Sequence, residues 1–160
     1  MHEPTLFALP PLQAIASSLS AVVIGPGMIG PQSTIAFVQA VLPLFRNAVV
    51  LLDALAMDAV RAGTRFAQPV ILTPHAGEMA HLTGAAKEDL REEPHACACR
   101  HAAAWNAVVA LKGATTCVAA PDGRCWTHRS NAPGLGTSGS GDVLAGVIAG
   151  LAARDRKSVV

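Results

Sequence analysis

The chain has 160 residues, of which 51% are hydrophobic and only 4% aromatic, and its formal net charge is +1. This length suits one domain with a real core, and the near-neutral charge without a basic run before the C-terminus argues against nucleic acid or a membrane surface as partner. The longest apolar run, residues 143–153, is too short to span a bilayer, and the first residues lack the pattern of a signal peptide. We therefore expect a cytoplasmic protein.

Short apolar runs rich in β-branched residues recur along the chain and predict strands at residues 21–24, 48–52, 69–72 and 107–111. Their hydrophobicity is continuous, which is typical of parallel strands covered on both faces. Helices are expected at residues 33–46, 54–62, 77–83, 87–105 and 138–153, with Pro94 breaking or starting one of them. A Pro-Asp-Gly-Arg turn joins a predicted hairpin of residues 115–120 and 124–128. The predicted fold is α/β: a doubly wound, mostly parallel sheet with helices on both faces and a short antiparallel hairpin.

Special residues gather where each predicted parallel strand ends. In chain order the groups are Gly25-Pro26-Gly27, Asp53, Thr73-Pro74-His75-Ala76-Gly77-Glu78 and Lys112-Gly113-Ala114-Thr115-Thr116. Ligands of open α/β sheets bind at the carboxyl edge of the strands. These groups therefore predict one shared binding site.

A glycine-rich run precedes the last predicted helix, from Gly134 through Gly136, Gly139 and Gly141 to Asp142. Glycines let successive backbone N–H groups converge on an anion, and the helix that follows adds its positive N-terminal end. Asp142 stands in the first turn, where a general base for a hydroxyl nucleophile would belong. Taken alone, the run fits either a phosphoryl-transfer site or only a flexible loop, and the groups at the strand ends must decide between the two.

A different interpretation fits the beginning of the chain. Gly25-Pro26-Gly27-Met28-Ile29-Gly30 matches the dinucleotide-binding fingerprint, and Asp53 lies near the spacing of a ribose-binding acid. This interpretation leaves Lys112-Gly113, His75 and the second glycine run unexplained. The chain contains no Walker A motif, which excludes a P-loop nucleotidase.

The four cysteines raise the question of metal binding. On a helix, His95 pairs with Cys99 and Cys97 with His101, on different faces, so four ligands do not easily converge on one tetrahedral zinc ion. Cys117 and Cys125 flank the predicted turn and are candidates to face each other across the hairpin. We expect free thiols and no protein metal site.

Taken together, the strand-end motifs and Gly139-Ser140-Gly141-Asp142 resemble the ADP-dependent NAD(P)H-hydrate dehydratases of the ribokinase-like superfamily. The resemblance covers residues 4–154. It implies removal of water from the (6S)-hydrate of NADH or NADPH, while ADP, or ATP in some members, becomes AMP and phosphate. A homo-oligomer is expected for the full-length protein.

The resemblance also implies residue roles. Asp142 would be the catalytic base and would contact the hydrated cofactor together with Gly27 and His75. The nucleotide would be bound by Lys112, Gly113, Ala114, Thr115, Thr116, Gly139, Ser140 and Gly141. Mg²⁺ is expected as a partner of the phosphates, held through water and not by a dedicated set of protein ligands.

Each of these residues also has a structural alternative. Asp142 could be an N-cap, His75 could cap the helix at 77–83, and Lys112 could be a solvated strand end. Asp53 could support only the fold or the region of the Mg²⁺-phosphate, and Glu78 more plausibly closes the helix start than touches substrate.

The chain also departs from the family pattern. Leu55 stands where a second acid is usual, and residues 1–154 are expected to be a partial domain without the family's first strand and glycine-rich turn. Residues 155–160 can be encoded by a common DNA sequencing adapter, so we expect a non-native tail. Two functions stay open beside the dehydratase: a ribokinase-like kinase of a vitamin-precursor alcohol, and a truncated nucleotide-binding domain without turnover.

Overall fold

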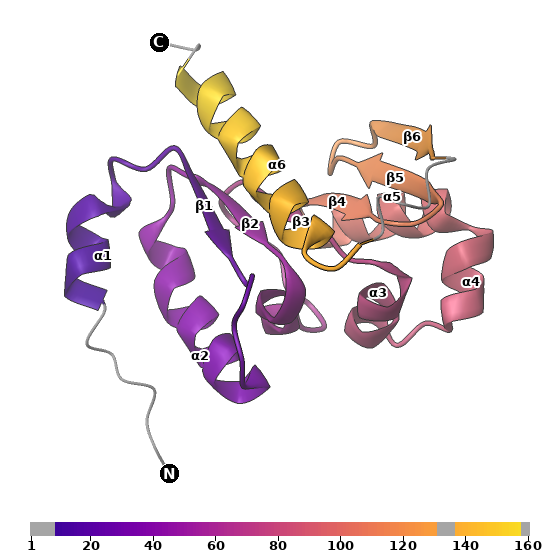
Figure 1. Ribbon diagram of the computed structural model, residues 1–160, viewed down its shortest axis with the longest axis horizontal. Helices are drawn as coiled ribbons and strands as arrows, with labels where there is room; N and C mark the ends of the chain where they lie inside the picture. Colours follow the sequence, from indigo (N-terminus) through magenta and orange to yellow (C-terminus); the bar gives the residue numbers. More distant parts are fainter. Residues whose placement is uncertain (1–8, 131–136, 158–160) are drawn as a thin grey trace.

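The structure is a computed structural model that describes residues 9–130 and 137–157. Its centre is a six-stranded sheet in the order β1-β2-β3-β4-β5-β6 (Figure 1). The strands are β1 (Ala21–Ile24), β2 (Val49–Leu52), β3 (Val70–Leu72), β4 (Val108–Leu111), β5 (Thr115–Ala119) and β6 (Cys125–Arg129). Strands β1 to β4 pair in parallel, and β5 and β6 add an antiparallel hairpin. The predicted sheet is confirmed.

The helices surround this sheet, and they differ in detail from the sequence prediction. They are α1 (Leu9–Ala16), α2 (Pro31–Val41), α3 (Ala76–Thr83), α4 (Lys87–Glu92), α5 (Pro94–Trp105) and α6 (Ser140–Lys157), with 3-10 segments η2 (Leu42–Leu44) and η3 (Ala54–Ala59). Pro94 begins α5, as expected. The prediction of a helix at 33–46 was too long, because Pro43 has no N–H to continue α2, and the chain tightens into η2.

Two further elements were predicted wrongly or missed. Residues 54–62 do not form an α-helix: in η3 the N–H of Ala56 bonds to the carbonyl of Asp53, a three-residue closure. Helix α1, which has two prolines near its start, was not predicted. Both lie in the first turn, where a missing N–H leaves no helical hydrogen bond unmade.

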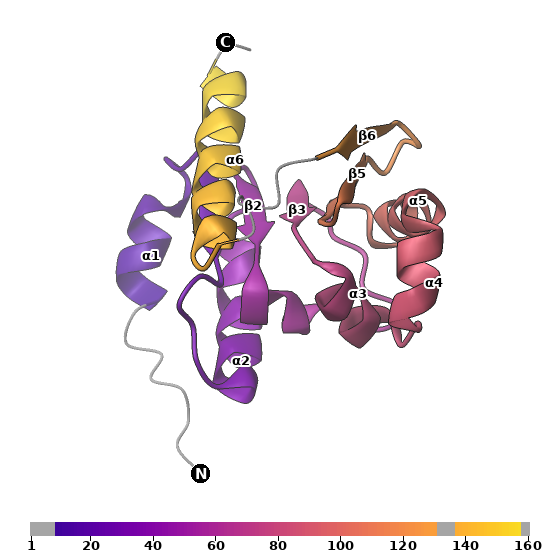
Figure 2. The same ribbon diagram turned by 45° about the vertical axis from the view of Figure 1, so that its right-hand side comes forward.

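Helices cover both faces of the sheet. Helix α6 crosses in front of the sheet in Figure 1 and contacts β1 and β2, whereas α5 lies behind β4 and β5. The turned view of Figure 2 shows α6 beside β2 and the group α3, α4 and α5 on the other side of the strands. Because both faces are covered, Val50, Leu51 and Leu52 of β2 are all buried.

The cysteines of the hairpin do not face each other. In the register of β5 and β6, Cys117 lies opposite Thr127 and Cys125 opposite Ala119, so the prediction of a directly facing pair was wrong. The physical reason is the turn, whose residues leave Ala120 and Arg124 as the closing pair. All four thiols are free.

Helix α6 runs through Arg154 to Lys157, so the backbone shows no break where the tail was placed, and the assignment of residues 155–160 stays a prediction. Within the described ranges, no helix is both long and apolar enough to cross a bilayer.

Candidate nucleotide site at the carboxyl edge of the sheet

Three neighbouring strands send polar side chains to one point. Asp53 follows β2, is 3% exposed, and accepts a 2.6 Å hydrogen bond at Oδ1 from the hydroxyl of Thr73, which follows β3. The ammonium group of Lys112, which follows β4, lies 3.3 Å from the same oxygen. A carboxylate buried among apolar strands is stable only with such partners. Asp53 therefore organises the floor of the site.

Gly25 allows β1 to join this cluster. Its φ is +129°, and a Cβ built there would lie 1.8 Å from the carbonyl oxygen of Asp53. No side chain fits at this position. Gly27 also has a positive φ, of +71°, but a Cβ there would meet nothing within 4 Å. The close approach in the Gly-Pro-Gly turn is therefore made by Gly25, whereas the predicted substrate contact was assigned to Gly27.

The N-terminus of α6 closes over the cluster. A Cβ on Gly141 would lie 3.9 Å from both Asp53 Oδ2 and Lys112 Nζ. The N–H of Ser140 bonds to the carbonyl of Thr137, but no acceptor within residues 9–130 and 137–157 receives the N–H of Gly141 or Asp142. Two free backbone donors at a helix start, beside an ammonium group, form a place for an anion.

The segment after Lys112 is held by its own hydrogen bonds. The hydroxyl of Thr116 donates to the carbonyl of Gly113 at 3.1 Å and accepts from the N–H of Gly113 at 3.3 Å. The carbonyl of Ala114 accepts from the N–H of Ser130. Thr115 opens β5 opposite Arg129. This segment is a shaped turn beside Lys112, with the Thr116 hydroxyl already engaged in shaping it.

His75 caps α3, as one of the two alternatives held. Its Nδ1 accepts from the N–H groups of Gly77 and Glu78, and the Glu78 carboxylate accepts from the N–H of His75. This is a complete capping box, which gives Glu78 its predicted structural role. Because Nδ1 is an acceptor here, a neutral ring carries its proton on Nε2, and the side chain is 60% exposed. Nε2 lies 3.6 Å from the Glu78 carboxylate, which is longer than a hydrogen bond, so its N–H remains available to another acceptor.

Asp142 lies in the first turn of α6 and is exposed. Its carboxylate has no hydrogen-bond partner within the part of the chain that the structure describes. Gly139 precedes the helix with φ +81°, a conformation that suits glycine. The rest of the glycine run, Gly134 to Gly136, lies outside the described residues.

The dinucleotide interpretation does not fit this geometry. Asp53 is buried against Thr73 and Lys112 and is not available to a ribose.

Sequence reasoning found most of this cluster but missed Thr73 as a partner and gave Asp53 a secondary place. The available signal was the position of Asp53 directly after a fully apolar strand, because a buried acid there must find a hydrogen-bond donor.

A separate groove of about 1160 Å³ lies at the opposite end of the strands, beside Val49 and Val70. None of the predicted site residues lines this groove.

The six-stranded sheet with helices on both faces is an α/β fold that the chain shares with ribokinase-like proteins. A ribokinase-like superfamily protein of Enterococcus faecalis matches with a TM-score of 0.78 at 24% identity, covering 92% of this chain and 52% of that one, a likeness of fold. The carbohydrate-kinase family model, described as NAD(P)H-hydrate dehydratase, matches residues 2–159. The chain therefore belongs to the NAD(P)H-hydrate dehydratase family.

Named relatives agree with this family. The ADP-dependent (S)-NAD(P)H-hydrate dehydratase of Xanthomonas campestris is 47% identical over 143 residues, which are 89% of this chain. The bifunctional NAD(P)H-hydrate repair enzyme Nnr of Moorella thermoacetica is 40% identical over 154 residues. The structure of the Bacillus subtilis dehydratase co-crystallised with ATP and Mg²⁺ matches with a TM-score of 0.71 at 31% identity, covering 92% of this chain and 57% of that one.

The chain spans about half the length of the Xanthomonas relative, 49%, and 29% of the Moorella enzyme.

Proposed function

We propose that this chain contributes the nucleotide-binding and catalytic half of an ADP-dependent NAD(P)H-hydrate dehydratase. The observation that carries the proposal is the meeting of Gly141, Lys112 and Asp53, with a Cβ position on Gly141 that is 3.9 Å from both charged side chains. Three segments distant in sequence thus surround one small space with a cation and free N–H donors. Relatives with this name at 38–47% identity support the same activity.

The cluster fits the phosphates of a nucleotide. Lys112 is 23% exposed, so its ammonium group reaches the surface of the site while Asp53 fixes its position. The N–H groups of Gly141 and Asp142 would hold the transferring phosphoryl oxygens, and the missing Cβ of Gly141 leaves room for them. The Lys112–Thr116 turn would line the AMP portion. ADP is our proposed nucleotide, with ATP as the alternative phosphoryl donor.

Mg²⁺ would bridge the phosphate oxygens and neutralise their charge when bound. Thr73 and Lys112 already occupy Oδ1 of Asp53. Asp53 therefore fits a supporting role beside the phosphates, and not that of one carboxylate in a complete set of protein ligands to the ion. The fit is therefore to an ion held mainly by phosphate and water.

Asp142 would act on the hydrate. Its exposed carboxylate is positioned by the first turn of α6, one residue after Gly141, and would accept the proton of the substrate hydroxyl. The hydroxyl oxygen then attacks the terminal phosphorus of ADP, and the bond to the AMP oxygen breaks. Loss of phosphate and of one ring proton restores the dihydropyridine. Phosphate is a far better leaving group than hydroxide, which is the reason for the nucleotide.

His75 and Gly27 would contact the hydrated cofactor. The exposed Nε2–H of His75 is a donor suited to an amide or phosphate oxygen, and its orientation is set by the capping box. Gly27 offers backbone with open space around it, which permits close approach of a ligand.

The proposal extends to the surroundings of the protein. We place the reaction in the cytoplasm, where the four free thiols of the protein would remain reduced.

Three apolar residues form an exposed stripe on α6: Val143, Val147 and Leu151 are 68%, 54% and 48% exposed. An exposed apolar stripe of this kind favours a contact that covers it, and a second subunit in a homo-oligomer of the full-length protein would provide that contact.

The test is a turnover assay. The chain is incubated with (6S)-NADPH hydrate, ADP and Mg²⁺, and the return of dihydropyridine absorbance is followed. We expect turnover in the wild type and its loss, by a factor of about a hundred or more, in Asp142→Asn. Asp89→Asn is the matched control, since Asp89 is also an exposed acid in the first turn of a helix. It should keep wild-type activity.

Two results would overturn the proposal. One is binding of ADP without any turnover, which is the behaviour of a nucleotide-binding domain alone. The other is phosphorylation of an alcohol by ATP with no reaction of the hydrate, which is the behaviour of a kinase.

A further inference from the structure

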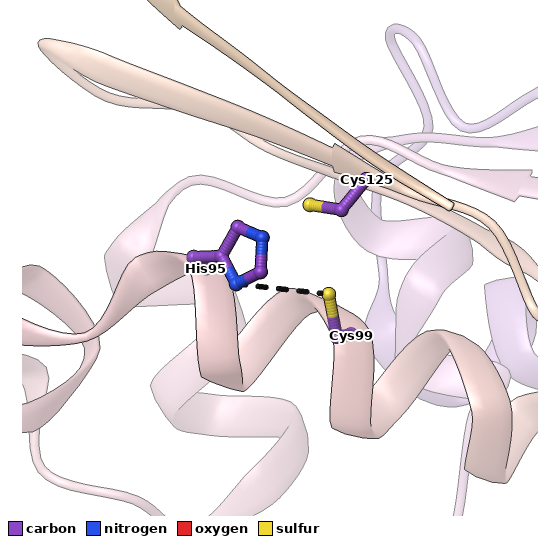
Figure 3. A group of neighbouring side chains, drawn as sticks. All are labelled: His95, Cys99 and Cys125. Atoms are coloured by element: carbon purple, nitrogen blue, oxygen red, sulfur yellow. Dashed lines mark hydrogen bonds between the residues drawn. The ribbon is translucent and has the colours of Figure 1, made fainter. Parts of the chain in front are cut away.

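A cluster of one imidazole and two thiols lies away from the nucleotide site. His95 and Cys99 belong to α5, and Cys125 is the first residue of β6. Their ligand atoms, one from each side chain, all lie within 4.8 Å of one another. Figure 3 shows His95 and Cys99 on one face of the helix, with the Cys125 sulfur directed toward them from the strand above. Two separate elements therefore supply three soft or borderline metal ligands to one place.

We propose that His95, Cys99 and Cys125 form a binding site for a thiophilic metal ion such as Zn²⁺, with a fourth position open to water. The ion would join α5 to the hairpin of β5 and β6. Nothing in the proposed dehydratase reaction uses this cluster.

The distances fit such an ion after small side-chain movements. Zn–S and Zn–N bonds of about 2.3 and 2.0–2.1 Å in a tetrahedral site place neighbouring ligand atoms roughly 3.5–3.8 Å apart. The Cys99 sulfur lies 3.9 Å from His95 Nδ1, and no pair exceeds 4.8 Å. Side-chain rotations that move each ligand atom by less than about 1 Å therefore bring the three groups to bonding geometry.

The spacing on α5 explains why only one of its two His/Cys pairs takes part. His95 and Cys99 are four residues apart, so they share a helix face, and this face lies under β6. The other pair, Cys97 and His101, points elsewhere: Cys97 is buried in the core and His101 packs against the ring of Trp105. The strand supplies the third ligand that the helix alone lacks.

The exposure of the ligands favours a metal that can enter from solvent. His95 is exposed, and both thiols are half-buried. A disulfide between Cys99 and Cys125 would leave the imidazole unused, whereas a metal ion uses all three groups. With three protein ligands, the fourth position would hold water or a small thiol.

The metal site is tested on the whole chain. The protein is first reduced and treated with a chelator to remove bound metal, and the chelator is then removed. Co²⁺ is titrated first, because thiolate-to-cobalt charge transfer and the strong d–d bands of tetrahedral Co²⁺ report the ligand type directly. We expect one Co²⁺ per chain and its displacement by Zn²⁺. Zn²⁺ should also raise the melting temperature, since only the folded chain joins helix and strand.

Variants assign the ligands. Cys99→Ala and Cys125→Ala should abolish tight binding, and His95→Gln should weaken it at least about tenfold. Cys97→Ala is the matched control, since it removes a thiol from the same helix but from outside the cluster. It should keep the cobalt spectrum.

Three results would overturn the proposal, and the first needs no variant. They are the absence of charge transfer in the wild type, equal binding by Cys99→Ala and Cys97→Ala, and a Cys99–Cys125 disulfide on mild oxidation in a reduced chain that binds no metal. None of these readouts depends on the dehydratase activity.

Discussion

The ammonium group of Lys112 lies 3.3 Å from Asp53 Oδ1, although these residues follow strands that are not neighbours in the sheet. Strand β3 runs between them, and its Thr73 donates to the same oxygen. One carboxylate oxygen thus connects the ends of three strands. This shared oxygen fixes Lys112 beside the N-terminus of α6, where the nucleotide phosphates are proposed to bind.

Thr73→Val tests this shared oxygen. Valine keeps the shape of threonine but removes the donor to a buried carboxylate, so we expect a loss of about 1.5–3 kcal/mol in the free energy of unfolding. Thr34→Val is the control, because Thr34 is 1% exposed and its hydroxyl has no partner in the described part of the chain. It should be neutral or stabilising in urea denaturation. Equal losses in both variants would contradict a stabilising role of the Thr73–Asp53 hydrogen bond.

Gly25→Ala and Gly27→Ala separate two glycines of one turn. Both have a positive φ, which costs an alanine about 1–2 kcal/mol. Only Gly25 also faces the Asp53 carbonyl at 1.8 Å from its Cβ position, so Gly25→Ala should be clearly the more destabilising change. Chemical denaturation measures the difference. A larger loss in Gly27→Ala would contradict the observed packing of β1 against Asp53.

His101 should make stability depend on pH. Burial, and then the charge of Arg100, lowers the pKa of His101 below its ordinary value of 6.5. The folded state therefore binds this proton less readily than the unfolded state does, and stability is lost as pH falls from 6.5 through the lowered pKa. Melting temperatures measured between neutral and mildly acidic pH should fall less steeply in His101→Gln. An unchanged slope in that variant would be the contrary result.

Metal binding at the His95 cluster should strengthen as pH rises. Burial and the hydrogen bond with Cys99 raise the pKa of Cys125 to about 11, with Cys117 adding to the effect. A metal ion must displace the Cys125 proton, so affinity should rise about tenfold per pH unit for that proton alone. Zn²⁺ competition with a chromophoric chelator at several pH values measures the slope. An affinity that does not change with pH would mean that Cys125 is no ligand.

The strands were predictable because their buried segments are continuously apolar. Short apolar runs such as Val49–Leu52 are typical of covered parallel strands, and the order of the strands places the residues that follow them at one carboxyl edge. Lys112 and Gly141 were assigned to one site by the family resemblance, and the structure brings them close together. The capping role of His75 was also within reach, since a glutamate follows three residues later.

What the sequence did not reveal depends on contacts between distant segments. The partners of Asp53 come from β3 and β4, and local pattern says nothing of a hydroxyl donor such as Thr73. Cys125 meets His95 only because the hairpin packs on α5, so helical spacing alone suggested incomplete metal pairs. Segment η3 was misread because its apolar residues do not distinguish an α-helix from a 3-10 turn.

The most direct test of the proposed phosphate site is the ADP affinity of Gly141→Ala compared with Gly146→Ala. A Cβ at Gly141 is in ordinary contact with Asp53 and Lys112, and one at Gly146 meets nothing within 4 Å, so neither variant should disturb the fold. Only the first fills the space beside the free N–H groups. By calorimetric titration with ADP and Mg²⁺, we predict that Gly141→Ala weakens binding at least about tenfold, or 1.4 kcal/mol, and that Gly146→Ala binds as the wild type does. Equal affinity in the two variants, or no ADP binding by the wild type, would contradict the account.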